Sequence, residues 1–318
     1  MPGVFLDRDS LDRHDLDLSL LQATLPEWRI YGTTAADETA ARIANAEVVV
    51  SNKVLLDEAV LAQAPRLKLI AIAATGTNNV DLEAAARRGI SVCNIRAYAT
   101  PSVVQHVFAL LLSLTRRLDD YQQAVRHGRW QQSDQFCLLD YPIRELGGLT
   151  LGIVGYGELG RAVAEVADKA FGMRILIAQR PGAPARPGRI GLHELLPQVD
   201  VLSLHCPLTE TTRRLIGAAE LALMKPGALL INTARGGLVD EPALAAALRE
   251  SRLGGAGIDV LETEPPTTES PLLSGDIPNL IVTPHIAWAS REARQRLADQ
   301  LAENIRAFFA GTPQNLVK

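Results

Sequence analysis

The chain has 318 residues, of which 47% are hydrophobic, and its 36 acidic and 32 basic side chains give a formal net charge of −4. This length is sufficient for two domains with separate cores. The weakly acidic balance argues against a nucleic-acid-binding surface, which needs clustered Lys and Arg. An anionic small-molecule substrate must therefore be held by local positive groups.

Cysteine usage and the N-terminus predict a cytoplasmic protein with no metal site. The cysteines Cys93, Cys137 and Cys206 are widely spaced and form no CxxC or Cys/His cluster, which is typical of reduced thiols. Charged residues begin at Asp7, so the N-terminus is not a secretory apolar segment. No apolar run approaches the ~18–20 residues of a membrane span, and we expect no membrane partner.

Short β-branched runs alternate with Ala/Leu-rich stretches, a pattern that predicts parallel α/β architecture. In the first part of the chain we expect helices at Glu38–Ile43 and Leu82–Arg87. The strands expected there are Gly3–Leu6, Glu47–Ser51, Leu69–Ala73 and Ser91–Asn94.

A long helix should begin at Thr100-Pro101 and run towards Tyr121, because Thr caps free amides and Pro suits the first helical position. A second α/β series follows, and the helix Arg291–Phe309 should close the chain. The strands expected in this series are Leu149–Val154, Arg174–Ala178, Val201–His205, Leu229–Thr233, Ala256–Val260 and Leu280–Thr283.

The segment LTLGIVGYGELGRAVAEV contains G-x-G-x-x-G at Gly155, Gly157 and Gly160. An apolar strand precedes this motif and an Ala-rich helix follows it, which is the context that dinucleotide binding requires. The first glycine permits the tight turn, the second lets the pyrophosphate approach the backbone, and the third allows close helix–strand packing. The amides at the helix start favour the phosphate charge.

The strand after this helix ends at Gln179-Arg180, where dinucleotide-binding proteins usually carry an acidic residue that binds the adenosine ribose. Gln179 can bind the ribose without repelling a 2′-phosphate. Arg180 is either a ligand for that phosphate or a solvated loop residue, and Arg189 is a more distant candidate. The sequence therefore leaves NAD and NADP open.

Three polar residues each follow a predicted strand of the second series: Arg235 in LLINTARGG, Glu264 in GIDVLETEPP and His285 in LIVTPHIAW. Open α/β sheets bind ligands at the carboxyl ends of their strands, so these side chains can converge. Arg235 can bind a carboxylate with two parallel hydrogen bonds. His285 can donate a proton to a developing alkoxide, and Glu264 can orient the imidazole. This chemistry suits reduction of a 2-oxo acid.

These motifs resemble the D-isomer-specific 2-hydroxyacid dehydrogenases over nearly the whole chain. The matching segments are ATGTNNVD, GIVGYGELG, HCPLTETTRRLIG, MKPGALLINTARGGLVDEPAL, GAGIDVLETEPP and TPHIAWAS. The resemblance implies two doubly wound parallel-sheet domains, with a Rossmann cofactor domain (residues 99–286) inserted in a flavodoxin-like substrate domain (residues 1–98 and 287–318). It also implies that Arg235, Glu264 and His285 form the catalytic trio.

The resemblance extends to ligand contacts. Thr75 and Gly76 match a loop whose backbone amides hold the substrate carboxylate, and Arg235 and His285 complete the substrate contacts. Trp288 is either a pocket wall or a packing residue. The positions that match cofactor contacts are Gly155, Tyr156, Gly157, Glu158, Leu159, Gly160, Gln179, Arg180, Cys206, Pro207, Thr233, Ala234, Arg235, Asp259 and His285. Family members are usually homodimers joined through the cofactor domain, so the helix Thr100–Tyr121 is a candidate interface.

Within the family, TGTNNVD, SVVQHVFALLL, FCLLDYPIREL and HIAWAS look most like glycerate dehydrogenases, also called hydroxypyruvate reductases. The expected reaction is NAD(P)H-dependent reduction of hydroxypyruvate or glyoxylate to D-glycerate or glycolate. Two residues depart from the family pattern: Gln179 replaces an acidic residue, and Ala287 stands where Gly is common. The alternative function is a nucleotide-sensing binding protein of the same fold without significant turnover.

Overall fold

The computed structural model describes residues 2–180, 182, 184, 186–266 and 270–317, and the chain divides into two compact units. Unit 1 comprises Met1–Ala99 and Ala289–Lys318, and unit 2 comprises Thr100–Trp288. The chain therefore builds most of unit 1, forms all of unit 2, and returns to unit 1 for its last helix.

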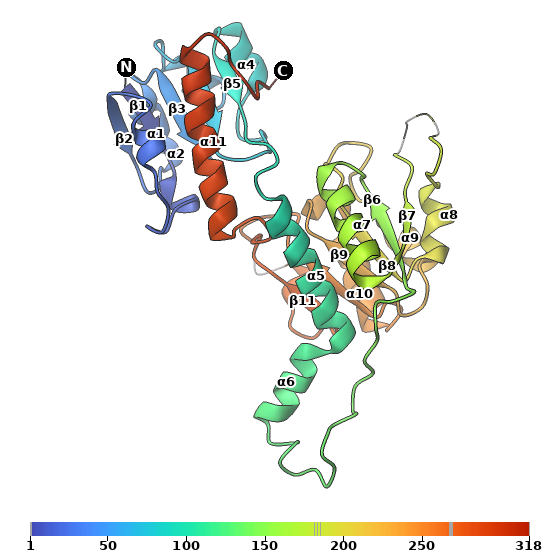
Figure 1. The fold of residues 1–318 in the computed structure, drawn as a ribbon. Helices are drawn as coiled ribbons and strands as arrows, with labels where there is room; N and C mark the ends of the chain where they lie inside the picture. Colours follow the sequence, from blue (N-terminus) through green and yellow to red (C-terminus); the bar gives the residue numbers. More distant parts are fainter. Residues whose placement is uncertain (1, 181, 183, 185, 267–269, 318) are drawn as a thin grey trace. The chain divides into compact units, whose positions relative to one another are not determined.

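Unit 1 contains a parallel five-stranded sheet in the order β2-β1-β3-β4-β5 (Figure 1). Its central strands are fully buried runs such as VVVS and LIAI, as expected for a parallel sheet covered on both faces. The strands are β1 Pro2–Phe5, β2 Glu27–Ile30, β3 Val48–Ser51, β4 Leu69–Ile72 and β5 Ser91–Cys93. The helices are α1 Ser19–Gln22, α2 Ala36–Ile43, α3 Glu58–Ala62, α4 Leu82–Arg87 and α11 Arg291–Phe309.

Unit 2 contains a parallel six-stranded sheet in the order β11-β10-β9-β8-β6-β7. A core of Leu, Ile, Val and Ala side chains lies between this sheet and its helices. The strands are β6 Thr150–Val154, β7 Arg174–Ile177, β8 Val201–Leu204, β9 Leu229–Asn232, β10 Gly255–Ile258 and β11 Leu280–Val282. The helices are α5 Thr100–Arg116, α6 Leu118–Arg126, α7 Glu158–Phe171, α8 Leu192–Leu195, α9 Ala218–Leu223 and α10 Glu241–Arg249.

The strand order reverses once in each sheet, next to β1 in unit 1 and next to β6 in unit 2. At such a switch point the loops after the two flanking strands diverge and leave a crevice, where open α/β sheets bind ligands. The crevice in unit 1 lies between the loops after β1 and β3, and that in unit 2 lies between the loops after β6 and β8.

The expected helix from Thr100 to Tyr121 is wrong in one respect, because α5 ends at Arg116 and a second helix, α6, begins at Leu118. Arg117 between them has a left-handed backbone (φ +54°). Its guanidinium binds the side chains of Asp120 and Asn279, and these contacts hold the break. Helix α6 and the chain after it extend away from the unit 2 sheet (Figure 1).

The predicted fold class, two doubly wound parallel α/β sheets, is confirmed. All ten expected strands are present within one or two residues of their predicted ends, and the last helix matches at both ends. The strand β2 was not predicted, because EWRI at the sheet edge is alternately exposed and contains no apolar run. Among the helices of the described residues, none has the length and apolar character that a membrane crossing needs.

Candidate active site

The turn after β6 has the geometry that its three glycines predict. Gly155 has φ +97°, and a Cβ there would lie 2.5 Å from the backbone of His205 and Cys206. A Cβ on Gly160 would lie 2.0 Å from the carbonyl oxygen of Gly155. A Cβ on Gly157, in contrast, would meet nothing within 4 Å. The turn is therefore closely packed on the protein side and open where a pyrophosphate would approach.

Helix α7 begins directly at this opening. Its N-cap residue is Gly157, which has no side chain to cap the first turn, so the amides at the start of the helix have no intrahelical acceptor. These amides belong to Glu158, Leu159 and Gly160, with Tyr156 just before them in the turn. The carboxylate of Glu158 accepts a hydrogen bond from the Thr100 hydroxyl. The first turn of α7 can thus bind a phosphate group.

The opposite wall of the crevice is the loop after β8, which contains His205, Cys206 and Pro207. Burial lowers the pKa of His205 to about 4, so its imidazole is neutral at physiological pH, and its Nε2 lies 2.8 Å from the Ser203 hydroxyl. Burial also raises the pKa of the Cys206 thiol to about 11. This wall is consequently uncharged, which suits contact with a nicotinamide or ribose ring.

The loop after β9 places Arg235 at the same edge of the sheet. The buried Asn232 holds the loop, because its side-chain amide donates to the Arg235 carbonyl at 2.9 Å and accepts from the Ala234 amide at 3.1 Å. The Arg235 guanidinium is exposed and donates to the Ala234 carbonyl at 2.7 Å. The hydroxyl of Thr233 is buried without a partner among the described residues, and a bound cofactor could supply that partner.

His285 and Glu264 form a hydrogen-bonded pair. His285 Nδ1 lies 2.6 Å from Glu264 Oε2, and both side chains are about one third exposed (31% and 34%). The other oxygen of Glu264 accepts from the Leu261 amide at 2.9 Å. Because Nδ1 faces the carboxylate, Nε2 is the ring nitrogen that points away from the pair. This arrangement suits a histidine that exchanges a proton at Nε2.

The three expected catalytic side chains follow the neighbouring strands β9, β10 and β11. The loops carrying two of them are closely packed, since a Cβ on Gly236 would lie 1.9 Å from the Leu261 carbonyl carbon. The structure therefore brings Arg235, Glu264 and His285 to one edge of the unit 2 sheet.

Asp259, at the end of β10, has its carboxylate turned into the protein (1% exposed) rather than towards the crevice. Oδ1 accepts from the Thr283 hydroxyl at 2.6 Å and the Ile286 amide at 2.9 Å, and Oδ2 accepts from the Ala287 amide at 2.9 Å. Burial raises its pKa, but hydrogen bonds, led by that from His106, outweigh burial and hold the pKa below its usual value. Asp259 is thus a charged anchor for the turn that carries His285.

His285 itself has a left-handed backbone (φ +55°), which costs a non-glycine residue about 1–2 kcal/mol. Its amide donates to the Asp259 carbonyl at 2.8 Å. Trp288 is half-buried, and its indole N–H donates to the His285 carbonyl at 3.0 Å. Hydrogen bonds on both sides of the residue therefore maintain the strained conformation.

The end of β7 carries positive but no negative side chains. Gln179 donates to the Pro184 carbonyl at 2.8 Å, and Arg180 is exposed. The Arg189 guanidinium lies 5.4 Å from the centre of the Tyr156 ring, which places it beside the glycine turn. No acidic residue occurs between Asp168 and Glu194.

Thr75 and Gly76 belong to unit 1, where they lie in the loop between β4 and α4. The Thr75 hydroxyl donates to the Ile95 carbonyl at 2.8 Å, and the Thr75 carbonyl accepts from Asn94 Nδ2 at 2.7 Å. Within the described residues, neither the Thr75 nor the Gly76 amide donates to a protein group. The loop is therefore fixed while both amides remain available to an anion.

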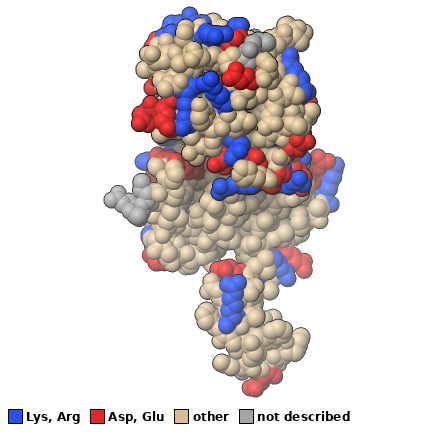
Figure 2. Space-filling view, turned by 90° about the vertical axis from the view of Figure 1, so that its left-hand side faces the viewer, with Lys and Arg blue, Asp and Glu red and all other residues tan. Residues whose placement is uncertain are grey.

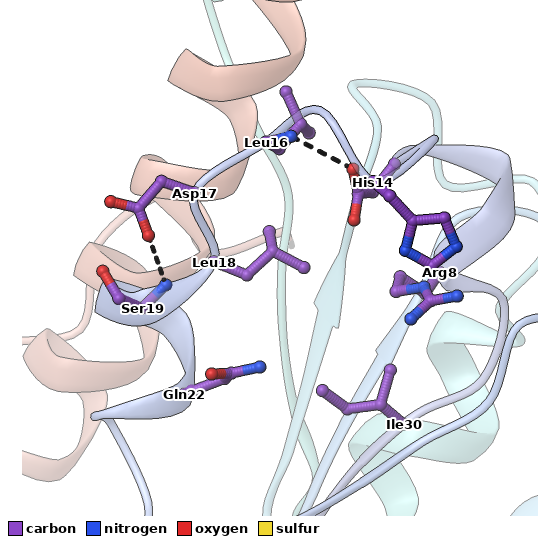
Figure 3. Close-up of a pocket in the computed structure, with 9 residues that line it drawn as sticks. Arg8, His14, Leu16, Asp17, Leu18, Ser19, Gln22 and Ile30 are labelled. Atoms are coloured by element: carbon purple, nitrogen blue, oxygen red, sulfur yellow. Dashed lines mark hydrogen bonds between the residues drawn. The ribbon is translucent and has the colours of Figure 1, made fainter.

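An open hollow of about 390 Å³ lies elsewhere in unit 1, beside the loop after β1 (Figure 3). Two of its charged groups are engaged with close neighbours: Arg8 pairs with Asp9 at 2.8 Å, and Asp17 accepts from the Ser19 amide at 2.9 Å. None of the sequence-predicted site residues lines it. The candidate site is therefore not this hollow but the edge of the unit 2 sheet.

Comparison with known proteins places this geometry in a family. Residues 108–287 match the model of the D-isomer specific 2-hydroxyacid dehydrogenase NAD-binding domain. The chain is 49% identical to glycerate dehydrogenase of Methylorubrum extorquens over 99% of this chain and 98% of the relative. It is 38% identical to hydroxypyruvate reductase of Blautia hydrogenotrophica over 100% of this chain and 99% of the relative.

A solved structure agrees: the NADPH-dependent glyoxylate/hydroxypyruvate reductase of Sinorhizobium meliloti superimposes with a TM-score of 0.83 at 29% identity, covering 99% of this chain and 97% of that chain. The chain belongs to the D-isomer-specific 2-hydroxyacid dehydrogenases. The predictions of the family and of a nicotinamide-dependent oxidoreductase are confirmed.

Proposed function

We propose that this enzyme reduces hydroxypyruvate or glyoxylate with NAD(P)H, giving D-glycerate or glycolate. The observation that carries the proposal is the His285–Glu264 pair at 2.6 Å, one strand away from the exposed guanidinium of Arg235. The names of the glycerate dehydrogenase and hydroxypyruvate reductase relatives support the substrate class. In this proposal unit 2 binds the cofactor and unit 1 contributes substrate contacts.

The proposed chemistry needs three groups from unit 2. Arg235 binds the substrate carboxylate with two parallel hydrogen bonds, since guanidinium and carboxylate geometries match. A bound nicotinamide cofactor supplies the hydride for the ketone carbon. His285 gives the proton on Nε2 to the ketone oxygen, which becomes the hydroxyl group. The hydrogen on Nδ1 stays on the imidazole, where it is hydrogen-bonded to Glu264. The neutral imidazole then regains its proton from solvent.

The cofactor contacts follow from the open parts of the crevice. The amides of Glu158, Leu159 and Gly160 would hold the pyrophosphate, and the unpartnered Thr233 hydroxyl would bind a polar group of the cofactor. The uncharged wall of Cys206 and Pro207 would contact a ring of the cofactor. Two further substrate contacts are proposed. In unit 1 they are the backbone amides of Thr75 and Gly76, and in unit 2 the side chain of Trp288 would form a pocket wall.

The direct test is oxidation of NADH and NADPH, followed by absorbance, with hydroxypyruvate, glyoxylate and pyruvate. Turnover should be strong with at least one pair, and His285→Ala should reduce kcat by about 10²–10⁴-fold. His193→Ala, which changes an exposed histidine paired with Glu220, is the matched control. Cofactor binding without turnover of any of the three acids would instead support the nucleotide-sensing function.

We infer further that the adenosine end of the site accepts a 2′-phosphate, so that NADPH is preferred. Gln179 offers no negative charge there, and Arg180 and Arg189 lie in the loop after β7. Loss of one charged hydrogen bond costs about 1.5–3 kcal/mol, so Arg189→Ala should raise the KM for NADPH by roughly 10–100-fold. The KM for NADH should change little. Arg174→Ala, at the other end of β7, is the control, and equal losses with both cofactors would contradict the inference.

We also propose that the protein is a homodimer, joined through α6 and the chain after it rather than through α5. The apolar side chains of α5 are largely buried within unit 2. In residues 118–149, Phe136 is 90% and Leu139 84% exposed, and uncharged residues cover most of the lobe at the bottom of Figure 2 on the face shown. A second copy of this segment would cover these side chains by symmetry.

The oligomeric state can be measured by light scattering after gel filtration. Phe136→Asp combined with Leu139→Asp should convert a dimer into a monomer, because it places charges in the proposed interface. Leu55→Asp, at a 58% exposed leucine of unit 1, should leave the dimer intact. A wild-type monomer would refute this part of the proposal. We also propose a cytoplasmic location for the protein. The unpaired thiols of Cys93, Cys137 and Cys206 support this location.

A further inference from the structure

Helix α5 makes two side-chain hydrogen bonds to the turn that carries His285. The Ser102 hydroxyl donates to the Ala287 carbonyl at 2.7 Å, and His106 Nε2 lies 2.9 Å from the Thr283 hydroxyl. Ser102 and His106 are four residues apart and therefore lie on one face of the helix. One helical turn thus contacts the turn two residues before His285 and two residues after it.

The direction of the second contact follows from the donors available. The Thr283 hydroxyl has one hydrogen, and it donates this hydrogen to Asp259 Oδ1 at 2.6 Å. Its oxygen must therefore accept from His106 Nε2–H. His106 Nε2 also lies 3.4 Å from Asp259 Oδ1. The result is a continuous chain of hydrogen bonds from α5 to the buried carboxylate.

That carboxylate in turn fixes the backbone beside His285, through the amides of Ile286 and Ala287. His285 adopts a left-handed backbone that an unrestrained residue would leave. Hydrogen bonding also keeps the pKa of Asp259 below its usual value despite burial, so the anchor stays charged. Every bond in this network restrains the segment Thr283–Ala287, which carries His285.

We propose that Ser102 and His106 are positioning residues for the reaction, which hold His285 in its reactive orientation through Ala287, Thr283 and Asp259. Neither residue needs to touch the substrate or the cofactor. The inference depends on the proposed function of His285 as proton donor, and it assigns to α5 a function in catalysis as well as in packing.

The kinetic test compares two replacements of His106. Leu removes the donor at similar volume, whereas Gln places an amide N–H near the position of Nε2. A misplacement of about 1 Å can cost roughly 100-fold in rate, so His106→Leu should reduce kcat about 10–100-fold with KM changed less than about threefold. His106→Gln should recover most of this loss, and Ser102→Ala should give a smaller loss. Gln105→Leu, at an exposed neighbour on α5, should match wild type.

A second measurement is independent of turnover. Hydrogen exchange at the Ile286 and Ala287 amides should accelerate about tenfold or more in His106→Leu and remain near wild type in His106→Gln. Thermal unfolding and NADPH affinity of both variants should stay close to wild type, which distinguishes a positioning effect from loss of the fold.

The outcomes separate the two proposals. If wild type reduces none of the acids, the proposed function fails, and hydrogen exchange alone decides whether α5 restrains the turn. If wild type is active and His106→Leu has the same kcat and the same amide exchange rates as wild type, the inference about α5 is refuted. Equal losses in the Leu and Gln variants would also refute it, since the donor would then not matter.

Discussion

Each of the two sheets of this enzyme has a crevice at its switch point, but one crevice is open and the other is occupied by a side chain of the protein. In unit 2 the crevice beside β6 is open: a Cβ on Gly157 would meet no atom within 4 Å, and uncapped amides begin α7. In unit 1 the crevice beside β1 is closed by Asp7. Its carboxylate accepts from the Asn52 amide at 2.9 Å and the Lys53 amide at 2.7 Å, both in the loop after β3.

The difference shows that topology supplies a crevice and that loop chemistry decides its use. Both crevices contain backbone amides that can bind an anion, in the loop after β3 in unit 1 and at the start of α7 in unit 2. In unit 1 the buried carboxylate of Asp7 accepts hydrogen bonds from the amides. In unit 2 the glycine turn has no such side chain, so the amides can bind a phosphate. Four experiments test this contrast.

The largest effect should come from closing the open crevice. Gly157→Val adds a side chain where the pyrophosphate approaches, and overpacking of this kind costs up to about 3 kcal/mol, or roughly 100-fold in cofactor affinity. Isothermal titration with NADPH would measure it. Gly191→Val is the control, since Gly191 also has open space around it in unit 2. Unchanged affinity in Gly157→Val would place the cofactor elsewhere.

Opening the closed crevice is the converse experiment. Asp7→Ala leaves the amides of Asn52 and Lys53 without their acceptor, and unsatisfied buried donors cost about 1–3 kcal/mol each. We expect a loss of about 2–3 kcal/mol in the free energy of unfolding, partly recovered by added formate, which can occupy the vacated position. Asp37→Ala, at an exposed acid on α2, should neither lower the free energy of unfolding nor respond to formate. A variant insensitive to formate would contradict the comparison.

The uncharged wall of the open crevice predicts a pH dependence. The pKa of His205 is lowered to about 4 in the folded protein, below the reference value of about 6.5. The unfolded chain therefore binds a proton more readily, and stability falls as the pH drops from about 6.5 to about 4. In His205→Gln the loss of unfolding free energy between about pH 6.5 and about pH 4 should be smaller than in wild type by about 2 kcal/mol. Parallel stability curves for wild type and variant would exclude the effect.

The smallest effect is expected in the loop of unit 1 that offers only backbone. Thr75→Ala removes one hydrogen bond to the Ile95 carbonyl, worth about 1 kcal/mol. The Thr75 and Gly76 amides remain in place, so substrate KM should rise less than about tenfold and kcat should hold. Steady-state kinetics with the preferred acid would measure both. A large loss of kcat would mean that the Thr75 side chain itself takes part.

The sequence was most informative where one physical requirement dictates the residue type. Buried parallel strands must be continuous apolar runs, so ten strands could be located, while the exposed edge strand β2 could not. The glycine turn was evident because Gly155 and Gly160 occupy positions where a Cβ would meet backbone. The three polar residues after β9, β10 and β11 could be grouped because strand ends of a parallel sheet share one edge.

The rest depends on contacts between distant parts of the chain. His106 lies on an apolar helix and looks like a packing residue, and its partner Thr283 is 177 positions away. Asp7 resembles any loop aspartate until Asn52 and Lys53 are placed against it. Asp259 was predicted as a cofactor contact from the family resemblance alone, and its hydrogen bonds to the Thr283–Ala287 turn could not be foreseen. The break at Arg117 had no signal either, because left-handed residues are usually Gly or Asn.

The depressed acidity of Cys206 has a consequence for the lifetime of the enzyme. With a pKa of about 11, roughly one thiol in 10⁴ is a thiolate at neutral pH, and the thiolate is the form that peroxides and alkylating agents attack. The sulfur of Cys206, in the loop after β8, is therefore a poor target for oxidative damage even though it lies in the wall of the open crevice.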